Sequence, residues 1–433
     1  MSTSCPHGAR KTGRAGERLS PAVELIDGVW HVRSYPLVKE VLRAGTTVQA
    51  GFNVDMVRGG ARAMREPILY LDGPEHRRQR SMIARYFAPA TVSRRYRELM
   101  ESRAAELVDE VRTETRAGRT VDLGRISLEY SVAVAAAVIG LTDSRGMARR
   151  LERLFAIPAQ PPRSHVGGED DAGGDSSRGV GAAVASLAGR FSAVVSATRG
   201  LGPVAHFYAR DVRPAIKARR ERRREDVISH LLDQGYTDSE ITTECVTYAA
   251  AGMVTTREYI CIVAWHLLED DDLRRRYVAG DEAERHELLH EILRLEPVVG
   301  HLFRRAVEDL TLTDGDVVHH VPAGAVLDLS IRAANADEGS VGADPLALCP
   351  GRDIPKGVRP EAMSFGDGNH RCPGNALAIQ ETDVLLTRLL SLPLGLHGEP
   401  RLGWLDLIVG YEVHDLRLAH NGGAEEQSAS VNH

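Results

Sequence analysis

The stretch Ser364-Phe-Gly-Asp-Gly-Asn-His-Arg-Cys-Pro-Gly-Asn-Ala-Leu-Ala378 decides the fold of this chain. Its glycines allow tight turns and let the backbone approach a flat ligand. Directly after it, apolar residues recur at helical spacing as far as Pro393, so a helix begins where the turn ends. Cys372 therefore lies just before a helix N-terminus, where amide donors and the helix dipole favour a thiolate.

A lone cysteine beside a glycine loop is ordinarily a buried structural residue, and Cys372 taken by itself would be interpreted that way. The ten-residue order Phe-Gly-x-Gly-x-His-x-Cys-x-Gly at 365–374 is far more specific, and it resembles the haem-binding loop of the cytochrome P450 family. The resemblance implies haem b as cofactor and Cys372 as the thiolate ligand of its iron. It also implies that Phe365 packs beside the sulfur and that His370 donates to a haem propionate. The loop residues that it assigns to the cofactor are Phe365, Gly366, His370, Cys372 and Gly374.

Length and composition exclude several classes of protein. The 433 residues are 43% hydrophobic, which suffices for a substantial core, and the net charge of −6 gives no indication of nucleic-acid binding. The five cysteines are scattered without metal-ligand spacing, as expected in a reducing cytosol. Residues 1–20 contain no apolar run and read as neither signal peptide nor membrane anchor. We predict a cytoplasmic protein without a membrane partner.

The resemblance extends over roughly Ala22 to His420. It implies one domain at 21–420, mainly α with a small β region, with haem between a long central helix and the cysteine loop. We expect a flexible segment at 1–20 and a disordered tail at 421–433. A Gly- and Asp-rich loop at 159–181 is either a lid that orders with substrate or an insertion without a role.

A second motif begins the helix expected after Asp72. His76 and Arg80 are four residues apart, so they project from one helix face and can converge on one anion. A solvated basic face is the alternative, but together with the cysteine loop the pair resembles the family's His-x-x-x-Arg clamp on the haem propionates. By the same resemblance Arg304 is a third propionate ligand, with Arg305 the weaker candidate.

The central helix is expected to begin with a capping box at Thr237 and to run to about Leu268. Its middle is rich in small residues, and a glycine there weakens the helical hydrogen bonding, so that a groove or water can intrude. Close helix packing over alanines is the alternative. The segment resembles the family signature Ala-Gly-x-acid-Thr-Thr. The matching residues are Ala251, Gly252, Thr255 and Thr256.

Val254 stands where the family usually has a carboxylate that helps to relay protons to oxygen. Thr255 can still hold a water or the oxygen itself, so oxygen activation remains open. A relay without its carboxylate needs another proton source, which could be solvent, Glu258 one turn on, or the substrate.

A helix ending before Pro297 carries Glu291 and Arg294 on one face. Such a pair is commonly an ordinary surface ion pair. Here it resembles the family's Glu-x-x-Arg, and Arg352 occupies the place of the later arginine that completes it. The implied role is structural: a buried charge network behind the haem.

The substrate pocket is the least determined part of the sequence. The resemblance puts the irregular segment 45–71, the middle of the central helix and two later loops around it, although Met and Phe in such loops are as often plain packing. The wall candidates are Phe52, Met56, Met253, Val254, Val299, His301 and Ile408.

The implied activity is that of a soluble bacterial haem-thiolate monooxygenase. It would use dioxygen, with electrons from ferredoxin and ferredoxin reductase, to hydroxylate a small molecule of secondary metabolism. Oxidative C–C or C–N coupling of aromatic or indole groups without oxygen insertion is the alternative, and Val254 favours it. A third class is a non-catalytic haem-binding sensor, which the retained Thr255 and propionate clamp oppose.

Overall fold

The computed structural model describes residues 7–52, 54, 65–142, 146–155, 202–405 and 408–421. The predicted loop at 159–181, nearly all of the predicted tail, and Met56 lie outside the described residues.

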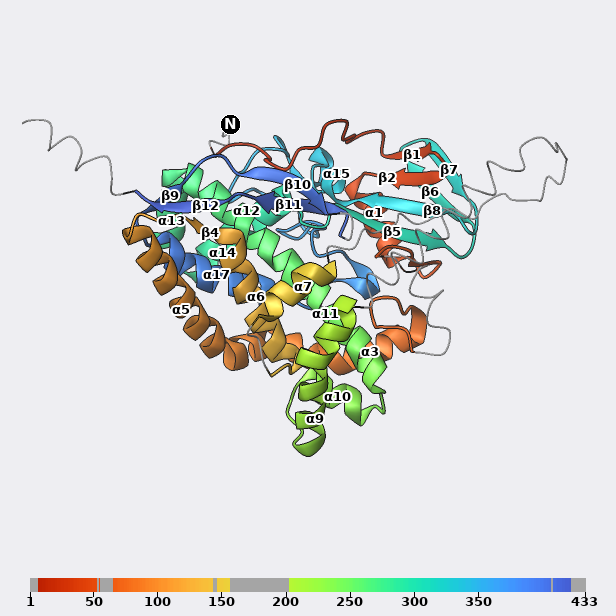
Figure 1. The fold of residues 1–433 in the computed structure, drawn as a ribbon. Coiled ribbons are helices and arrows are strands. Elements are labelled where there is room, and N and C mark those ends of the chain that lie inside the picture. The colour runs from red at the N-terminus through yellow and green to blue at the C-terminus, as the bar shows by residue number, and fades with distance from the viewer. Residues whose placement is uncertain are drawn as a thin grey trace, which may run out of the picture.

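Helices make up the larger part of the molecule, and the β-strands gather along one edge of it (Figure 1). The predicted fold class, mainly α with a small β region, is confirmed. The α-helices are α1 (Tyr35–Arg43), α3 (Gly73–Phe87), α4 (Pro89–Thr91), α5 (Arg97–Arg116), α6 (Leu123–Ile139), α7 (Met147–Phe155), α9 (Arg213–Glu221), α10 (Val227–Asp233), α11 (Asp238–Ala249), α12 (Thr255–Glu269), α13 (Asp271–Ala279), α14 (Glu282–Leu295), α15 (Ile331–Ala334), α16 (Glu338–Val341) and α17 (Asn375–Leu390). Three π-helical segments and one 3₁₀ turn complete them, at Val92–Tyr96, Tyr208–Val212, Ala250–Val254 and Gly368–His370.

Four small sheets occur in the described residues. The largest has the strand order β1-β2-β8-β5-β3 and is antiparallel except for the β2–β8 pair, in which Trp30 lies opposite Leu327. The strands are β1 (Val23–Ile26), β2 (Val29–Val32), β3 (Thr47–Gln49), β4 (Val121–Asp122), β5 (His301–Ala306), β6 (Leu310–Asp314), β7 (Val317–Val321), β8 (Val326–Ser330), β9 (Leu394–Leu396), β10 (Arg401–Leu405), β11 (Gly410–His414) and β12 (Arg417–His420).

Local sequence explains where the helices begin. The predicted capping box at Thr237 is present: its hydroxyl accepts from the Glu240 N–H, and the Glu240 carboxylate accepts from the Thr237 N–H. Asp281 and Glu284 form the same arrangement at the start of α14. The helix α6, rich in Ala and Val, is buried on nearly all sides, as predicted.

The predicted central helix is not one regular helix. Between α11 and α12 the backbone widens into a π turn at Ala250–Val254, around Gly252. A π turn inserts one extra residue into the helical register, and such turns are frequent at functional sites. The weakening expected at Gly252 therefore takes the form of a π turn.

Residues 7–20 differ from the flexible segment expected there, because they pack against the body of the molecule. Thr12 is fully buried, and its N–H and hydroxyl both donate to the carboxylate of Glu296. Arg10 donates to carbonyl groups at the end of α14 and in α15. In return, the guanidinium of Arg332 donates to the Thr12 carbonyl and hydroxyl. We name residues 7–20 the N-terminal strap.

The cysteines were expected to be reduced, but Cys349 forms a disulfide bond. The free cysteines among the described residues are Cys245, Cys261 and Cys372.

Within the described residues, no helix is both long and apolar enough to cross a membrane.

Candidate active site

A cavity of about 500 Å³ lies between α3, the π turn with α12, strand β5 and the cysteine loop. Its walls are mostly aliphatic and aromatic side chains from α3, α6, α7 and α11. Cys372 borders it from one side, and Ala251, Gly252 and Thr255 border it from the π turn and α12. The cavity therefore brings together the two motifs that the sequence singled out, although they are more than a hundred residues apart.

The cysteine loop folds back on itself. The Cys372 N–H donates to the Phe365 carbonyl at 2.8 Å, which holds Phe365 next to the cysteine. Gly368 has a φ of +64°, and a Cβ on it would lie 2.2 Å from the Leu42 carbonyl oxygen, so glycine is required there. Gly374, by contrast, has a φ of −87°, so its backbone does not demand a glycine as we expected.

The environment of the Cys372 thiol is mixed. Burial raises the pKa of the Cys372 thiol, while a hydrogen bond from the Gly374 N–H and the charges of Arg80 and Arg371 act to lower it. The predicted position just before a helix N-terminus is present, since Cys372 lies three residues before the first residue of α17. In the protein alone, burial has the larger effect, so the pKa of the Cys372 thiol is raised overall.

Four basic side chains gather at one end of the cavity. The rings of His76 and His370 stack with centroids 4.0 Å apart, and His370 Nε2 lies 3.0 Å from an Asp72 carboxylate oxygen. Arg80 donates to the backbone carbonyl of residue 371. Arg304, 3% exposed, donates to the Gln49 side chain and to a backbone carbonyl.

This end of the cavity fits an anion. His76 is 2% exposed, and its Nδ1 has no hydrogen-bond partner among the described residues. Burial and the neighbouring charges of His370 and Arg80 lower the pKa of His76 to about 3. Burial likewise lowers the pKa of Arg304 to about 10. Burying a cation without a partner costs free energy. Two carboxylates of a ligand would therefore stabilise this basic cluster by pairing with it.

The donor set as a whole fits haem b. A thiol on one wall can bind iron, an apolar cavity can hold the macrocycle, and the basic cluster can hold two propionates. When bound, haem supplies the redox chemistry that activates dioxygen. Cys372 is the residue that would hold the iron, and His76, Arg80, Arg304 and His370 are the residues that would hold the propionates.

Not every predicted wall residue reaches the cavity. Phe52, Val299 and Ile408 line it, whereas Met253 and Val254 do not. Met253 belongs to the hydrophobic core instead, and its carbonyl accepts from Ser131 of α6. Val254 is buried but does not line the cavity, so the expectation for these two residues was wrong.

His301 is also absent from the cavity wall. Its Nδ1 lies 2.8 Å from the carboxylate of Asp328 on the neighbouring strand β8, and His31 Nδ1 lies 3.0 Å from the same carboxylate. Although burial opposes its ionisation, the hydrogen bonds from His301 and His31 lower the pKa of Asp328 to about 2. His301 therefore belongs to an ion-pair cluster in the sheet.

The sequence analysis missed two charged residues of the cavity, Asp367 and Glu381. Glu381, on α17, is 2% exposed and lines it. In the sequence it stands four residues after Leu377 and four before Leu385, on the apolar face of its helix. A carboxylate on an apolar face is the pattern that could have identified it.

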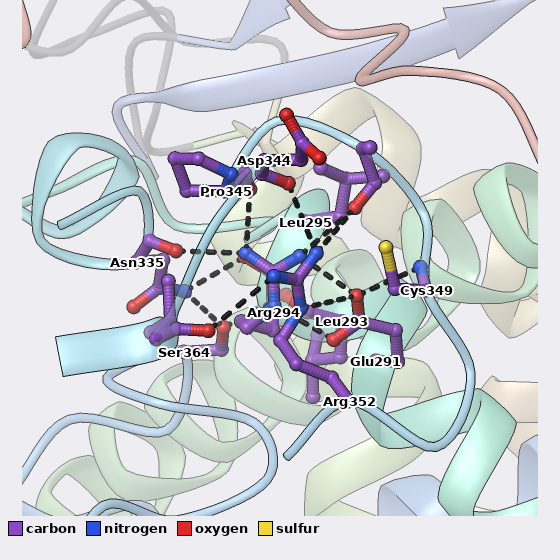
Figure 2. A network of polar contacts seen from close by, with 12 residues as sticks. Glu291, Leu293, Arg294, Leu295, Asn335, Asp344, Pro345, Cys349, Arg352 and Ser364 are labelled. Carbon is purple, nitrogen blue, oxygen red and sulfur yellow. Dashed lines mark hydrogen bonds and ion pairs between the residues drawn. The ribbon is translucent and has the colours of Figure 1, made fainter. Parts of the chain in front are cut away.

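The predicted triad of Glu291, Arg294 and Arg352 lies behind the cysteine loop (Figure 2). Arg294 is fully buried and donates to both carboxylate oxygens of Glu291, at 2.7 and 2.8 Å. Arg352 Nε donates to Glu291 at 3.1 Å. Arg294 also donates to the backbone carbonyl of Asn335, whose side-chain amide donates to Ser364 at the start of the cysteine loop.

We predict that Arg304→Ala weakens haem retention strongly. A hydrogen bond to a charged group contributes about 1.5–3 kcal/mol, which corresponds to roughly 10- to 100-fold in affinity. The measurement is the rate of haem transfer to an excess of a competing haem acceptor. Arg78→Ala, on the exposed face of α3, is the matched control and should leave the rate unchanged. Equal rates for both variants would contradict this role of Arg304.

Known proteins resemble this chain in sequence and in fold. The family model described as Cytochrome P450 matches residues 286–392. A steroid C26-monooxygenase of Mycolicibacterium smegmatis is 27% identical over 406 residues, which are 89% of this chain and 83% of that protein. A putative cytochrome P450 133B2 of Xylella fastidiosa is 31% identical over 205 residues, about half of each chain (46% and 47%).

A solved structure extends the likeness to the fold. The enzyme CYP109E1 of Bacillus megaterium, in complex with corticosterone, superposes with a TM-score of 0.70 at 20% identity and covers 93% of this chain and 95% of that chain. Motif, cavity and fold thus agree with these relatives. The chain belongs to the cytochrome P450 family of haem-b oxidoreductases.

Proposed function

We propose that the protein is a monooxygenase that hydroxylates a small, uncharged, largely apolar molecule. The observation that carries this proposal is how charge is distributed in the cavity. The basic side chains that line it are His76, Arg80, Arg304 and His370, and all of them belong to the cluster fitted to the propionates. Among the described residues, no further cation lines the cavity to pair with a charged substrate.

The remaining walls support an apolar ligand with a few hydrogen-bonding groups. Hydroxyl groups reach the cavity from Tyr70, Thr247 and Tyr248, among aliphatic and aromatic side chains. The Tyr70 hydroxyl donates to the Phe52 carbonyl at 2.9 Å, which fixes that wall. Sites of this composition recognise ligands by shape and orient them through few polar contacts. The relatives' names, a steroid monooxygenase and a corticosterone complex, agree with this chemistry.

The protein's own groups would orient substrate and handle protons. Val299 and Ile408 line the cavity, so their side chains can help to fix which carbon of the substrate faces the reaction centre. Thr255 donates its hydroxyl proton to the Ala251 carbonyl, which leaves the hydroxyl oxygen free to accept from a water or a reacting group. The apolar walls exclude bulk water, and this limits wasteful side reactions.

The test is a ligand-shift screen followed by mass analysis of the product. Neutral steroids and macrolactones serve as first probes, and their carboxylated analogues of equal size serve as controls. We expect the neutral ligands to shift the haem spectrum and to yield a product heavier by one oxygen. Preferential binding of the carboxylated analogues would contradict the substrate class, and turnover without oxygen in the product would contradict hydroxylation.

One observation favours a second function, oxidative coupling. Val254 supplies no carboxylate, and Glu258 does not replace it, since its carboxylate accepts from Arg257 and from the Val413 N–H away from the cavity. If the reaction is a coupling that returns no oxygen to substrate, Thr255→Ala should change the yield little. If it is hydroxylation, the same variant should release most of the electrons as peroxide.

We further propose that ferredoxin and its reductase supply the electrons. Arg77, Arg78 and Arg85 are exposed on α3, and α3 contacts the cysteine loop through Arg80. Arg371, in the cysteine loop, is paired with Glu361 at 3.1 Å and is left out of this basic face.

An exposed basic face speeds encounter with an acidic partner, and salt screens it. We therefore predict that the reduction rate falls with ionic strength and that the double variant Arg77→Glu and Arg78→Glu removes most of this salt dependence. Arg112→Glu, whose arginine side chain is partly exposed on α5, is the control and should preserve it. A reduction rate indifferent to salt would exclude this docking face.

A further inference from the structure

Arg332 lies next to the cavity wall without lining the cavity. Its side chain is 1% exposed, and the residue before it, Ile331, is part of the wall. The guanidinium is held by the N-terminal strap. It donates to the Thr12 hydroxyl at 2.9 Å and to the two carboxylate oxygens of Glu17 at 2.6 and 3.1 Å. Arg332 therefore connects the strap to the wall of the site.

The same arginine contacts the segment that carries another wall residue, Val299. A Cβ on Gly300 would lie 2.9 Å from Arg332 Cδ and 2.8 Å from the Val409 carbonyl oxygen, so this segment is held closely between them. The Gly300 N–H donates to that carbonyl at 3.0 Å. Both Val299 and Ile408, the neighbour of Val409, line the cavity. A displacement of Arg332 would therefore be passed on to the backbone of two wall residues.

Trp404 forms a second connection between the strap and the wall. It lies on β10, and the turn that joins β10 to β11 carries Ile408. The guanidinium of Arg14, in the strap, lies 4.7 Å from the centre of the Trp404 ring, and that of Arg332 lies 5.5 Å from it. At these distances a cation is attracted to the face of an indole ring. The strap thus holds the hairpin as well as Arg332.

Thr12 is the residue on which this attachment depends most. Its side chain is fully buried, and its hydroxyl donates to the Glu296 carboxylate at 2.5 Å while it accepts from Arg332. Valine has nearly the shape of threonine but no hydroxyl, so it would leave both charged groups short of one buried partner. Serine would keep both hydrogen bonds.

We propose that the N-terminal strap positions the cavity wall and so helps to determine which carbon of the substrate is oxidised. Thr12 and Arg332 are its positioning residues, and neither of them lines the cavity. They act through their contacts on three wall residues, which are Val299, Ile331 and Ile408. This inference rests on the proposed monooxygenase function. A merely structural strap would affect stability and leave the choice of carbon unchanged.

The experiment compares Thr12→Val with Thr12→Ser and Thr115→Val in the haem-loaded enzyme, with corticosterone as the probe. Thr115, on α5, is the matched control because it is 3% exposed, donates to the Val111 carbonyl and does not line the cavity. Misplacing reacting groups by about 1 Å costs about a hundredfold in rate, so we expect Thr12→Val to change the ratio of hydroxylated isomers about threefold or more. Thr12→Ser and Thr115→Val should keep the wild-type ratio. A wild-type ratio in Thr12→Val would overturn the proposal.

Backbone hydrogen exchange tests the same contacts without turnover or a bound probe. In Thr12→Val, we expect the Gly300 N–H to exchange about tenfold faster, while the amides of α12 keep their wild-type rates. If Thr12→Val retains too little haem for turnover, this exchange decides. Faster exchange confined to residues 7–20, with an unchanged rate at Gly300, would also overturn the proposal. A wild type that forms no oxygenated product from any neutral steroid or macrolactone would instead refute the proposed function, while exchange at Gly300 still tests the strap.

Discussion

Replacing Cys372 by alanine is expected to abolish the spectrum of a thiolate-ligated haem completely. Cys372 is the one free cysteine among the described residues that lines the cavity, which Thr255 also lines. Without a sulfur ligand, the CO complex of the reduced protein should lose its long-wavelength Soret band, and product formation should fall to background. Cys372→Ser should retain part of the haem, because the basic cluster still holds the propionates, but with a different band position.

The other free cysteines provide matched controls. Cys245 and Cys261 are fully buried and do not line the cavity. Cys245→Ala and Cys261→Ala should therefore keep the thiolate spectrum, apart from a modest loss of stability. A thiolate band that persists in Cys372→Ala, or disappears in either control, would refute the assignment of the ligand.

The second large effect is expected at Arg294, because its removal leaves the Glu291 carboxylate buried with only part of its hydrogen bonding (Figure 2). Removing one partner of a buried ion pair costs about 3–5 kcal/mol. That is a large part of the roughly 5–15 kcal/mol by which folded proteins are stable. We expect Arg294→Ala to yield little haem-bound protein, and urea unfolding of what remains should show the loss.

An alanine substitution at an exposed position of the same helix, α14, separates the loss of the ion pair from the effect of alanine on helix propensity. Glu287, exposed on α14, can be changed to alanine with an expected effect near zero. Arg294→Lys keeps the charge but loses the two-pronged contact with Glu291, so most of the destabilisation should remain. A stable, haem-loaded Arg294→Ala would show that the network is dispensable.

Much of the site could be predicted because its determinants are local. The turn around Gly368, the helix beginning after Gly374 and the i, i+4 spacing of His76 and Arg80 are each contained within a few residues. Such patterns specify the backbone directly, whatever the rest of the chain does. The Glu291–Arg294 pair is likewise one turn of helix.

The predictions that failed concern residues whose surroundings are formed by parts of the chain that are distant in sequence. The sequence around Val254 does not reveal that the segment forms a π turn or that Val254 does not line the cavity. His301 is taken out of the pocket by Asp328, a residue on another strand. Glu381 acquires meaning only when α17 packs against α12, since a single carboxylate in a helix is unremarkable until its surroundings are known.

The N-terminal strap has a consequence for how the chain is made. Thr12 bonds to Glu296, 284 positions later, and to Arg332, 320 positions later. A ribosome delivers the strap long before its partners, so the strap must wait, unpaired, until about 300 further residues have emerged. Contacts of such long sequence separation form late and slowly. The strap is therefore synthesised well before Glu296 and Arg332 but is among the last segments to reach its native position.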